Sequence, residues 1–473
     1  MQDYETVMGL EIHAELSTAS KIFCDCENAF GGAPNSRICP ICTGQPGVLP
    51  RLNRQAVALA VQAGLALDGE IAEESAFDRK NYIYPDLPKA YQITQLRQPI
   101  VKGGFIEKNG KSFRIHHIHL EEDAGKLVHT PDFTGIDYNR CGVPLVEIVT
   151  EPDFRSAQEI KDFVEEVILR LQYAGICDGR MEQGSLRVDV NLSVRPAGAE
   201  QLGERTEMKN LNSFRFIKRA VEYESRRQIE LLENGGQVFR ETLRFLPETG
   251  ETTVMRSKEE VADYRYFPEP DLPVIHISEQ EIEMLRTAMP QMPHIRRNRY
   301  QREYGLSEEA AVQLTAKRET ADFFERVCNL GASPRETAKL ILTTLIRLFR
   351  DNQEIPGSGG ISAEQLAGAV RLLEEGRISK TAAKELVAVL FYEDCQAQEA
   401  AEAHGWILED HDEQIKAYID RIILENPKCA EDFRNGNQKS GGYLMGLLMR
   451  SGISGIHPGR AREYLEQRLK SHK

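Results

Sequence analysis

The stretch GLEIHAEL, Gly9 to Leu16, alternates apolar and polar residues over its whole length. Leu10, Ile12, Ala14 and Leu16 fall on one face, and Glu11, His13 and Glu15 fall on the other. A period of two predicts a half-buried β-strand. Its polar face carries two carboxylates and an imidazole. That face is either simply hydrated or the floor of a site that uses oxygen and nitrogen ligands.

Further strands and helices surround this stretch in the first half of the chain. SLRVDVNLSVRP (185–196) alternates in the same way, and RCGVPLVEIVTEP (140–152) indicates another strand. A capping box, Ser156 with Glu159, predicts the start of a helix. A second helix is expected over 213–236, where two glycines end it. Strands joined by irregular, Gly- and Pro-rich connections favour an α+β fold with a mixed sheet.

The second half of the chain lacks this strand pattern. Amphipathic helices with brief loops are expected instead over 333–350, 362–376 and 379–393, with a last helical segment over 437–469. We therefore expect three domains: a mixed-sheet cradle domain over residues 1–292, an all-α helical domain over 293–405 and a small α-helical tail domain over 406–473.

Composition narrows the class of protein. The formal net charge of −14 argues against a protein that coats nucleic acid over its whole surface. The last segment, Lys428–Lys473, is nevertheless basic, with nine Lys and Arg against four Asp and Glu. It suits a confined anionic partner such as a folded RNA, or it is an ordinary solvated helical surface. No apolar run long enough to span a membrane and no secretion signal is evident, so we expect a cytoplasmic protein without membrane contact.

Four of the nine cysteines are clustered in CDCENAFGGAPNSRICPIC. Cys24 and Cys26 form one pair and Cys39 and Cys42 another, in a loop rich in turn residues. Two close thiolate pairs are typical of a closed tetrahedral zinc site, which would be structural because no coordination position stays open. Four coincidental free cysteines are the alternative.

Carboxylates suited to a catalytic metal lie on several of the expected strands. Glu147 interrupts the apolar VPLVEIV, where a bare carboxylate costs several kcal/mol unless it is paired or binds a metal. The other candidates are Glu11 with His13, the cluster Glu121, Glu122 and Asp123, and Glu182, Asp189, Glu151 and Glu207. Such oxygen ligands suit Mg²⁺, and an imidazole among them also suits Mn²⁺. Each carboxylate alone can equally be a surface charge or part of an ion pair.

Familiar nucleotide-binding motifs are missing from the sequence. It contains no G-x-x-x-x-G-K-[ST] phosphate loop, no G-x-G-x-x-G turn and no kinase catalytic loop. It also offers no convincing serine or cysteine nucleophile with a partner base. If the protein uses ATP, it must hold the phosphates by a different arrangement of metal ligands and basic side chains.

Several long motifs closely resemble one family along essentially the whole chain. These are DRKNYIYPDLPKAYQITQ (78–95), LEEDAGK, EIVTEPD, KNLNSF (209–214) and DYRYFPEPDLP (263–273). They resemble the B subunit of the bacterial aspartyl/glutamyl-tRNA(Asn/Gln) amidotransferase. The resemblance implies an ATP-dependent carbon–nitrogen ligase that phosphorylates the side-chain carboxylate of Glu on misacylated tRNA(Gln), or of Asp on tRNA(Asn). Ammonia released from glutamine by an amidase-type A subunit then displaces the phosphate, and a small C subunit completes a heterotrimer.

The resemblance also implies roles for residues of this chain. The family's metal-binding positions correspond to His13, Glu122 and Glu207. Glu11, Glu147 and Asp189 are expected to bind the metal as well or to contact its ligands. Lys80 matches a motif near the same pocket. The catalytic group is thus expected to comprise Glu11, His13, Lys80 and Glu147, the Mg²⁺ ligands His13, Glu122, Glu207, Glu11 and Asp189, and the zinc ligands Cys24, Cys26, Cys39 and Cys42. Lys439, Arg450, Arg460 and Arg462 are expected to contact tRNA phosphates. Glu15 has no assigned role and is expected to be solvated or ion-paired.

Two other functions compete with this interpretation. A non-catalytic, zinc-stabilised RNA-binding protein would use its carboxylates only structurally. A metallohydrolase acting on a small phosphoester would need neither RNA nor glutamine.

Overall fold

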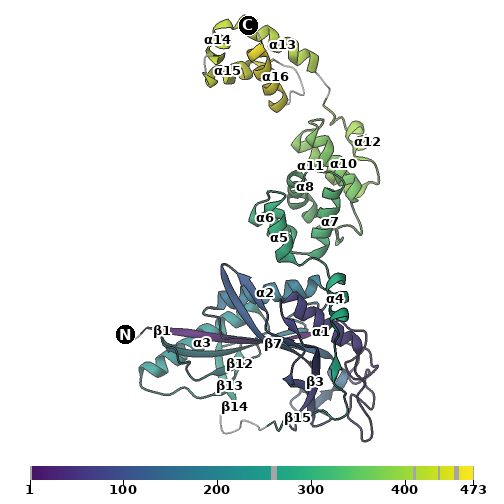
Figure 1. The fold of residues 1–473 in the computed structure, drawn as a ribbon, viewed down its shortest axis with the longest axis vertical. Coiled ribbons are helices and arrows are strands. Elements are labelled where there is room, and N and C mark those ends of the chain that lie inside the picture. The colour runs from purple at the N-terminus through teal and green to yellow at the C-terminus, as the bar shows by residue number, and fades with distance from the viewer. Residues whose placement is uncertain (1–2, 257–263, 409–411, 435–436, 452–457, 472–473) are drawn as a thin grey trace. The chain divides into compact units, whose positions relative to one another are not determined.

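A computed structural model describes residues 3–256, 264–408, 412–434, 437–451 and 458–471 (Figure 1). These residues form two compact units, Met1–Pro293 and His294–Lys473. The first unit combines strands and helices, and the second is helical, which confirms the expected α+β class.

A ten-stranded mixed sheet forms the centre of the first unit, in the order β14-β13-β12-β11-β1-β10-β7-β5-β2, with β6 paired to β7. Only β12 and β13 run parallel among the pairs of this sheet that the structure describes. Its strands are β1 (Tyr4–Glu15), β2 (Glu70–Ile71), β5 (Val101–Lys102), β6 (Phe105–Lys108), β7 (Lys111–Glu122), β10 (Pro144–Thr150), β11 (Leu186–Pro196), β12 (Thr206–Lys209), β13 (Glu241–Leu246) and β14 (Glu251–Arg256).

Two smaller sheets accompany it. One is built on β3, which pairs with β4, β15 and β16, and the other is the β8–β9 hairpin. Their strands are β3 (Glu74–Asn81), β4 (Tyr91–Gln98), β8 (Lys126–His129), β9 (Thr134–Asp137), β15 (Phe267–Pro268) and β16 (Ile275–His276).

One face of the central sheet is apolar and packs on helices. The inward residues of β1, Leu10, Ile12 and Ala14, are at most 1% exposed and join a core with α1, α2 and α3. In Figure 1, α1 and α2 run above the sheet, whereas β3 and β15 lie below β7. The helices of this unit are α1 (Arg54–Ala66), η1 (Tyr138–Arg140, 3₁₀), α2 (Ala157–Tyr173), α3 (Phe214–Glu233) and α4 (Glu279–Ala288).

The expected elements around the site are present. Residues Gly9–Glu15 of GLEIHAEL lie within β1, which ends one residue before Leu16. The stretch 140–152 contains β10, 185–196 contains β11, and the two expected helices are α2 and α3. The capping box of α2 forms only in part. Ser156 Oγ accepts from the Glu159 amide, but the Glu159 carboxylate accepts from the Arg155 amide instead of the Ser156 amide.

The second unit contains two separate apolar cores. Its helices are α5 (Pro293–Arg302), α6 (Glu308–Leu314), α7 (Arg318–Asn329), α8 (Pro334–Leu340), η3 (Ile341–Leu345), α9 (Ile346–Asp351), α10 (Ala363–Glu374), α11 (Lys380–Tyr392), α12 (Ala397–Ala403), α13 (Asp412–Glu425), α14 (Pro427–Arg434), α15 (Gln438–Met449) and α16 (Pro458–Ser471). The single helix expected over 333–350 is divided by a π-helical turn, η3. Trp406 and Ile407 are partly buried against the first core, while α13 to α16 form the second.

Candidate active site

The second face of the central sheet gathers polar side chains from five adjacent strands. Strand pairing sets their positions, because directly opposed residues share a face. His13 on β1 is opposite Glu147 on β10 and Arg187 on β11, and Glu147 is in turn opposite His119 on β7. Glu11 is opposite Asp189 on β11. We call this surface the polar face.

One group of metal-ligating side chains on the polar face comprises His13, Glu121 and Glu147. One ligand atom from each lies within 4.8 Å of the others. His13 Nε2 is 3.3 Å from Glu147 Oε2 and 3.4 Å from Glu121 Oε1. His119 Nε2 lies 3.3 Å from the same Glu147 oxygen, and its Nδ1 is buried without a hydrogen-bond partner among the described residues. Carboxylate oxygens and an imidazole nitrogen at this spacing fit a divalent cation.

His13, His119, Glu121 and Glu147 stabilise one another in their charged forms. Burial alone would lower the pKa of His119, but Glu147 and Glu121 raise it to about 10. Burial is likewise outweighed at His13, whose pKa is raised by Glu147 and Glu121. Burial would raise the pKa of Glu147, yet His13 and His119 hold it well below its usual range. The protonated His13 and His119 thus balance the carboxylate charge, and a bound divalent cation would balance it in their place.

A second group, Glu11 with Asp189 and Glu207, lies further along the same face, also within 4.8 Å. Lys209 Nζ lies between two of its members, 2.8 Å from Asp189 Oδ2 and 2.6 Å from Glu207 Oε1. Burial, followed by the charges of Glu147 and Glu207, raises the pKa of Glu11. The two groups therefore interact electrostatically, and a cation is the natural partner for their accumulated negative charge.

Lys80, on β3, lies beside the first group. Its Nζ is 4.9 Å from the ring centre of Tyr264 and 5.8 Å from that of Tyr82. Burial disfavours its ammonium, but Glu121 and neighbouring tyrosines raise its pKa above the usual value. Lys80 thus stays charged where an anionic substrate would meet the polar face. Arg79 beside it is instead bound to Glu269 and Asp271.

Glu122 differs from the expectation, because it is not brought together with His13. Its carboxylate forms an ion pair with Lys89 and accepts from the Ile93 amide at 2.9 Å. The reason is strand parity: in β7 successive side chains point to opposite faces, so Glu121 shares the face of His119 whereas Glu122 does not. The alternation of HHIHLEE was the signal that distinguishes the two glutamates.

Other polar-face residues had no role in the sequence interpretation. The strand register places His119 opposite Glu147. Lys209 forms ion pairs with Asp189 and Glu207. Glu15 is not simply solvated, because burial and the nearby Asp123 raise its pKa to about 7. Arg187 is bound to Asp123 at 3.1 Å.

The four clustered cysteines form a separate centre. Cys24, Cys26, Cys39 and Cys42 offer sulfur atoms within 4.8 Å of one another, and Cys24 and Cys42 are buried. A hydrogen bond from the Cys24 thiol, with help from the Cys39 amide and Lys21, lowers the pKa of Cys42 to about 5. This arrangement can hold a metal ion with thiolate ligands.

Lys21 completes the surroundings of the cysteines. It is fully buried, and its Nζ lies 3.8 Å from Cys42 Sγ while donating to the carbonyl of Arg37 at 2.9 Å. A buried ammonium needs a compensating anion, and the thiolate sulfur provides one. The loop that carries the four cysteines therefore favours a negatively charged sulfur at Cys42.

The expected tRNA contacts lie in the second unit. Lys439 on α15 is exposed, and Arg450 at the end of α15 donates to the Gly446 carbonyl at 3.1 Å. Arg462 on α16 is exposed and pairs with Glu466 at 2.9 Å. The side chain of Arg460 lies outside the described residues.

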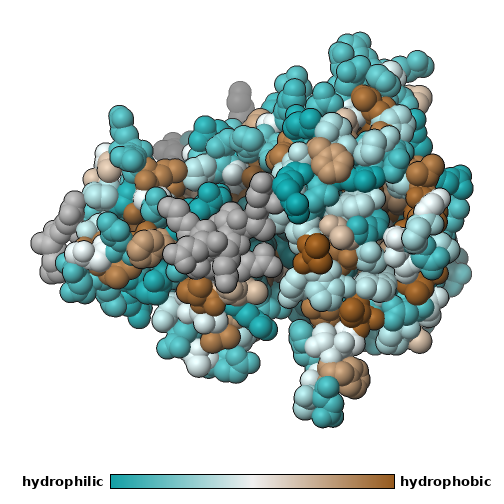
Figure 2. Space-filling model, turned by 90° about the horizontal axis from the view of Figure 1, so that it is seen from below, coloured by the Kyte–Doolittle hydropathy of each residue, from teal (hydrophilic) through white to brown (hydrophobic). Residues whose placement is uncertain are grey.

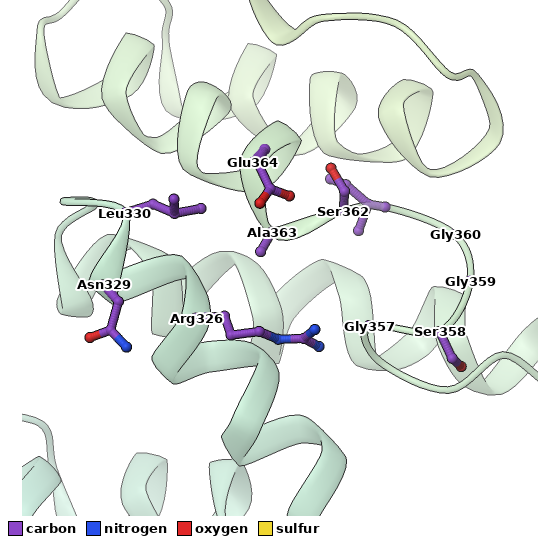
Figure 3. A pocket seen from close by; sticks show the side chains of 11 residues that line it. Arg326, Asn329, Leu330, Gly357, Ser358, Gly359, Gly360, Ser362, Ala363 and Glu364 are labelled. Atoms are coloured by element: carbon purple, nitrogen blue, oxygen red, sulfur yellow. The ribbon is translucent and has the colours of Figure 1, made fainter.

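Another cavity, of about 460 Å³, lies away from the polar face (Figure 3). It lies between α7 and the loop Gly357–Gly360 that precedes α10, with Arg326 pointing toward the loop. Its lining holds one carboxylate, Glu364, and no imidazole or thiol, so it is a weaker candidate for catalysis than the polar face.

The surface offers no single large apolar patch on the face shown in Figure 2, where hydrophobic side chains occur in small groups among hydrophilic ones. No helix among the described residues is both long and apolar enough to cross a membrane.

Comparison with known proteins covers nearly the whole chain. Residues 6–283 match the family described as the GatB/GatE catalytic domain, and residues 322–469 match the GatB domain. A protein of Caldicellulosiruptor saccharolyticus is 46% identical over 477 residues, covering 99% of both chains. Proteins of Lachnoclostridium phytofermentans and Brevibacillus brevis are each 44% identical, over 99% and 100% of both chains. All three are named as the B subunit of an aspartyl/glutamyl-tRNA(Asn/Gln) amidotransferase.

Proposed function

The chain belongs to the family of B subunits of aspartyl/glutamyl-tRNA(Asn/Gln) amidotransferases, and from this premise we propose that it activates the amino acid on a misacylated tRNA for amidation. The substrate is Glu on tRNA(Gln), Asp on tRNA(Asn), or both. A side-chain carboxylate oxygen attacks the γ-phosphorus of ATP, and ADP leaves. Ammonia then attacks the carbonyl carbon of the acyl phosphate, and inorganic phosphate leaves.

The polar face is the observation that carries this proposal. Activation brings two anions together, the triphosphate and the substrate carboxylate, so their repulsion must be reduced. The groups His13–Glu121–Glu147 and Glu11–Asp189–Glu207 together suit Mg²⁺, or Mn²⁺ in its place. A bound divalent ion would neutralise phosphate charge at the moment of attack. In this proposal Glu121 takes the place that the sequence interpretation gave to Glu122.

Two lysines support the same chemistry from the sides of the polar face. Lys80 is charged beside Glu121 and can contact the transferring phosphate or the substrate carboxylate as a point charge. Lys209 is held by Asp189 and Glu207. If a metal ion were bound by those carboxylates, the Lys209 ammonium would become available to a phosphate oxygen.

The remaining parts have supporting roles in the proposal. Zinc on the four cysteines stabilises the loop over residues 24–42 and takes no part in the reaction. Ammonia comes from glutamine on the amidase-type A subunit, and the small C subunit completes the heterotrimer. The helical region 293–405 and the tail 406–473 bind the tRNA body, with Lys439, Arg450, Arg460 and Arg462 against its phosphates. The complex works in the cytoplasm.

The test is amidation by the assembled complex. The chain is purified together with the A and C subunits and supplied with glutamine, ATP, Mg²⁺ and each misacylated tRNA in turn. Conversion of Glu-tRNA(Gln) or Asp-tRNA(Asn) to its amide, with ADP formation, is expected. No amide from either tRNA would overturn the proposal. ATP turnover without charged tRNA, retained after removal of residues from about 406 onward, would favour a small-molecule hydrolase instead.

A further inference from the structure

Strand β12 supplies two charged side chains of the polar face, although it is only four residues long. Because side chains alternate along it, Glu207 and Lys209 belong to the polar face. Thr206 and Met208 point to the other side, where both are buried, and Met208 is the only apolar residue of the strand. What holds so short a strand in place therefore also decides where Glu207 lies relative to the other two carboxylates of the second group.

A carboxylate on α3, Glu224, binds this strand from the helix side. Glu224 is fully buried, and its Oε1 accepts from Thr206 Oγ1 at 3.1 Å. Gln228, one helical turn further along and equally buried, donates from Nε2 to Glu224 Oε1 at 2.8 Å and to Thr206 Oγ1 at 2.9 Å. These three side chains form a closed ring of hydrogen bonds between α3 and the first residue of β12.

The other contacts of Glu224 extend this network to β14 and along α3. Thr252 on β14 donates to Oε2 at 3.1 Å. Arg227 donates from Nε to Oε2 at 2.8 Å and from a terminal nitrogen to Oε1 at 2.7 Å. A buried carboxylate is tolerated when it is paired and hydrogen-bonded, and these groups supply that compensation. Removing its charge should therefore loosen the attachment of α3 to β12 and β14.

Glu224 can influence the polar face without touching it. Thr206 and Glu207 are adjacent in the chain and point to opposite faces of the sheet, so a displacement of the backbone at Thr206 also displaces Glu207. On the polar face, Glu207 accepts from Thr242 Oγ1 at 3.1 Å and pairs with Lys209. Those contacts fix the end of the Glu207 side chain, whereas the network around Glu224 fixes the backbone that carries it.

We propose that Glu224 is a positioning residue, whose network sets the place of β12 in the sheet and so holds Glu207 within ligand distance of the other members of the second group. The inference rests on the proposed function, because it takes the second group as a cation site of the reaction. It adds a residue on the opposite face of the sheet to those on which that site depends. Glu224 itself touches neither ATP nor the amino acid.

The first test measures cation binding by the complex of the chain with its A and C subunits, without ATP or tRNA. Glu224→Gln keeps the size of the side chain but removes its charge. Binding of Mn²⁺, followed by the electron paramagnetic resonance signal of the free ion, should weaken about tenfold at one site. Unchanged Mn²⁺ binding at a temperature below the unfolding transition would overturn the inference.

Glu166→Gln is the matched control. Glu166 on α2 is also a buried helical carboxylate, and it pairs with Arg170 at 3.3 Å as Glu224 pairs with Arg227. Both variants should lower the thermal midpoint of unfolding, but only Glu224→Gln should weaken Mn²⁺ binding. An equal loss of Mn²⁺ affinity in the two variants would indicate general destabilisation and would overturn the positioning role.

Thr206 provides a second pair of variants, which tests the inference even if Glu224→Gln does not fold. Thr206→Val keeps the shape of the side chain but removes the hydroxyl, so it should weaken Mn²⁺ binding. Thr206→Ser keeps the hydroxyl and should bind Mn²⁺ as the wild type does. Equal Mn²⁺ affinities of the two variants would contradict the inference.

Kinetics and a double substitution locate the effect at Glu207. In Glu224→Gln the Mg²⁺ concentration for half-maximal amidation should rise about tenfold, whereas the rate at saturating Mg²⁺ should stay within about twofold of the wild type. In a Glu207→Gln background, Glu224→Gln should weaken Mn²⁺ binding no further, because both substitutions act through the same ligand. Additive losses would overturn the inference.

Amide formation tests the proposed function separately. A complex that makes no amide from either misacylated tRNA would overturn that function, even if the Mn²⁺ results were as expected. If only the Mn²⁺ results failed, Glu224 would lose its positioning role and the proposed function would stand.

Discussion

The cysteine centre and the polar face are two ways of building a ligand cluster. The four cysteines lie within one loop, all donate sulfur, and a buried Lys21 faces them. The polar face takes oxygen and nitrogen donors from five strands, and it lies next to a pocket and a charged lysine. The first is closed and suits a structural ion, whereas the second is open and suits a reaction. Losing the first should cost stability, and losing the second should cost activity.

The largest expected effect tests the activity side of this comparison. Glu147→Gln should lower amidation about a thousandfold, because Glu147 is the member of the polar face shared by His13 and His119 and several kcal/mol of charge stabilisation depend on it. Single-turnover formation of acyl phosphate or amide measures the loss. The thermal midpoint of the first unit serves as the control. A variant that keeps full activity would remove the polar face from the mechanism.

The cysteine centre should respond in the opposite way. Cys39→Ser, or a strong chelator, should release one zinc ion and destabilise the first unit by several kcal/mol, since metal binding energy is folding energy. Thermal unfolding and metal analysis measure this. At temperatures below the new transition, the Mg²⁺ dependence of the reaction should be that of the wild type. A changed Mg²⁺ dependence would contradict the separation of the two centres.

A paired substitution then sharpens the assignment within β7. Glu121→Gln should raise the Mg²⁺ concentration needed for half-maximal activity by about 10- to 100-fold. Glu122→Gln should leave that concentration unchanged, because Glu122 is bound to Lys89 and to the Ile93 amide. The titration is run on both variants at the same ATP concentration. The reverse order of effects would restore Glu122 as the metal ligand.

The smallest effect is expected at Lys21. Lys21→Met keeps the length of the side chain but removes the cation beside Cys42, so zinc should be lost to a competing chelator at about tenfold lower chelator concentration. Amidation with zinc bound should not change. Unaltered zinc retention would mean that the ammonium serves only to bind the carbonyls of Arg37 and Tyr138.

Features that depend on neighbouring residues could be predicted from the sequence better than the pairing of distant strands. The strand at Gly9–Leu16, the helix after Ser156 and the cysteine loop depend on neighbouring residues, and each was found at its expected place. The choice between Glu121 and Glu122 depends on which residues of β7 point to the same face of the sheet as Glu147 on β10. The resemblance alone pointed to the residue on the other face, away from His13. His119 and Lys209 gain their positions only from the register of distant strands. A pocket beside Gly9 could not be predicted either, because it needs β1, β10 and the 202–205 segment together.

The place of β1 in the sheet also has a consequence for synthesis. β1 is made first, but its two neighbours are β10, which begins at Pro144, and β11, which begins at Leu186. Until both have left the ribosome, β1 has two open edges and an apolar face, the features that expose a nascent chain to aggregation. Glu207 and Lys209 follow later still. A fragment that ends just before β12 therefore carries the residues of the first group, His13, Glu121 and Glu147, but lacks Glu207 of the second.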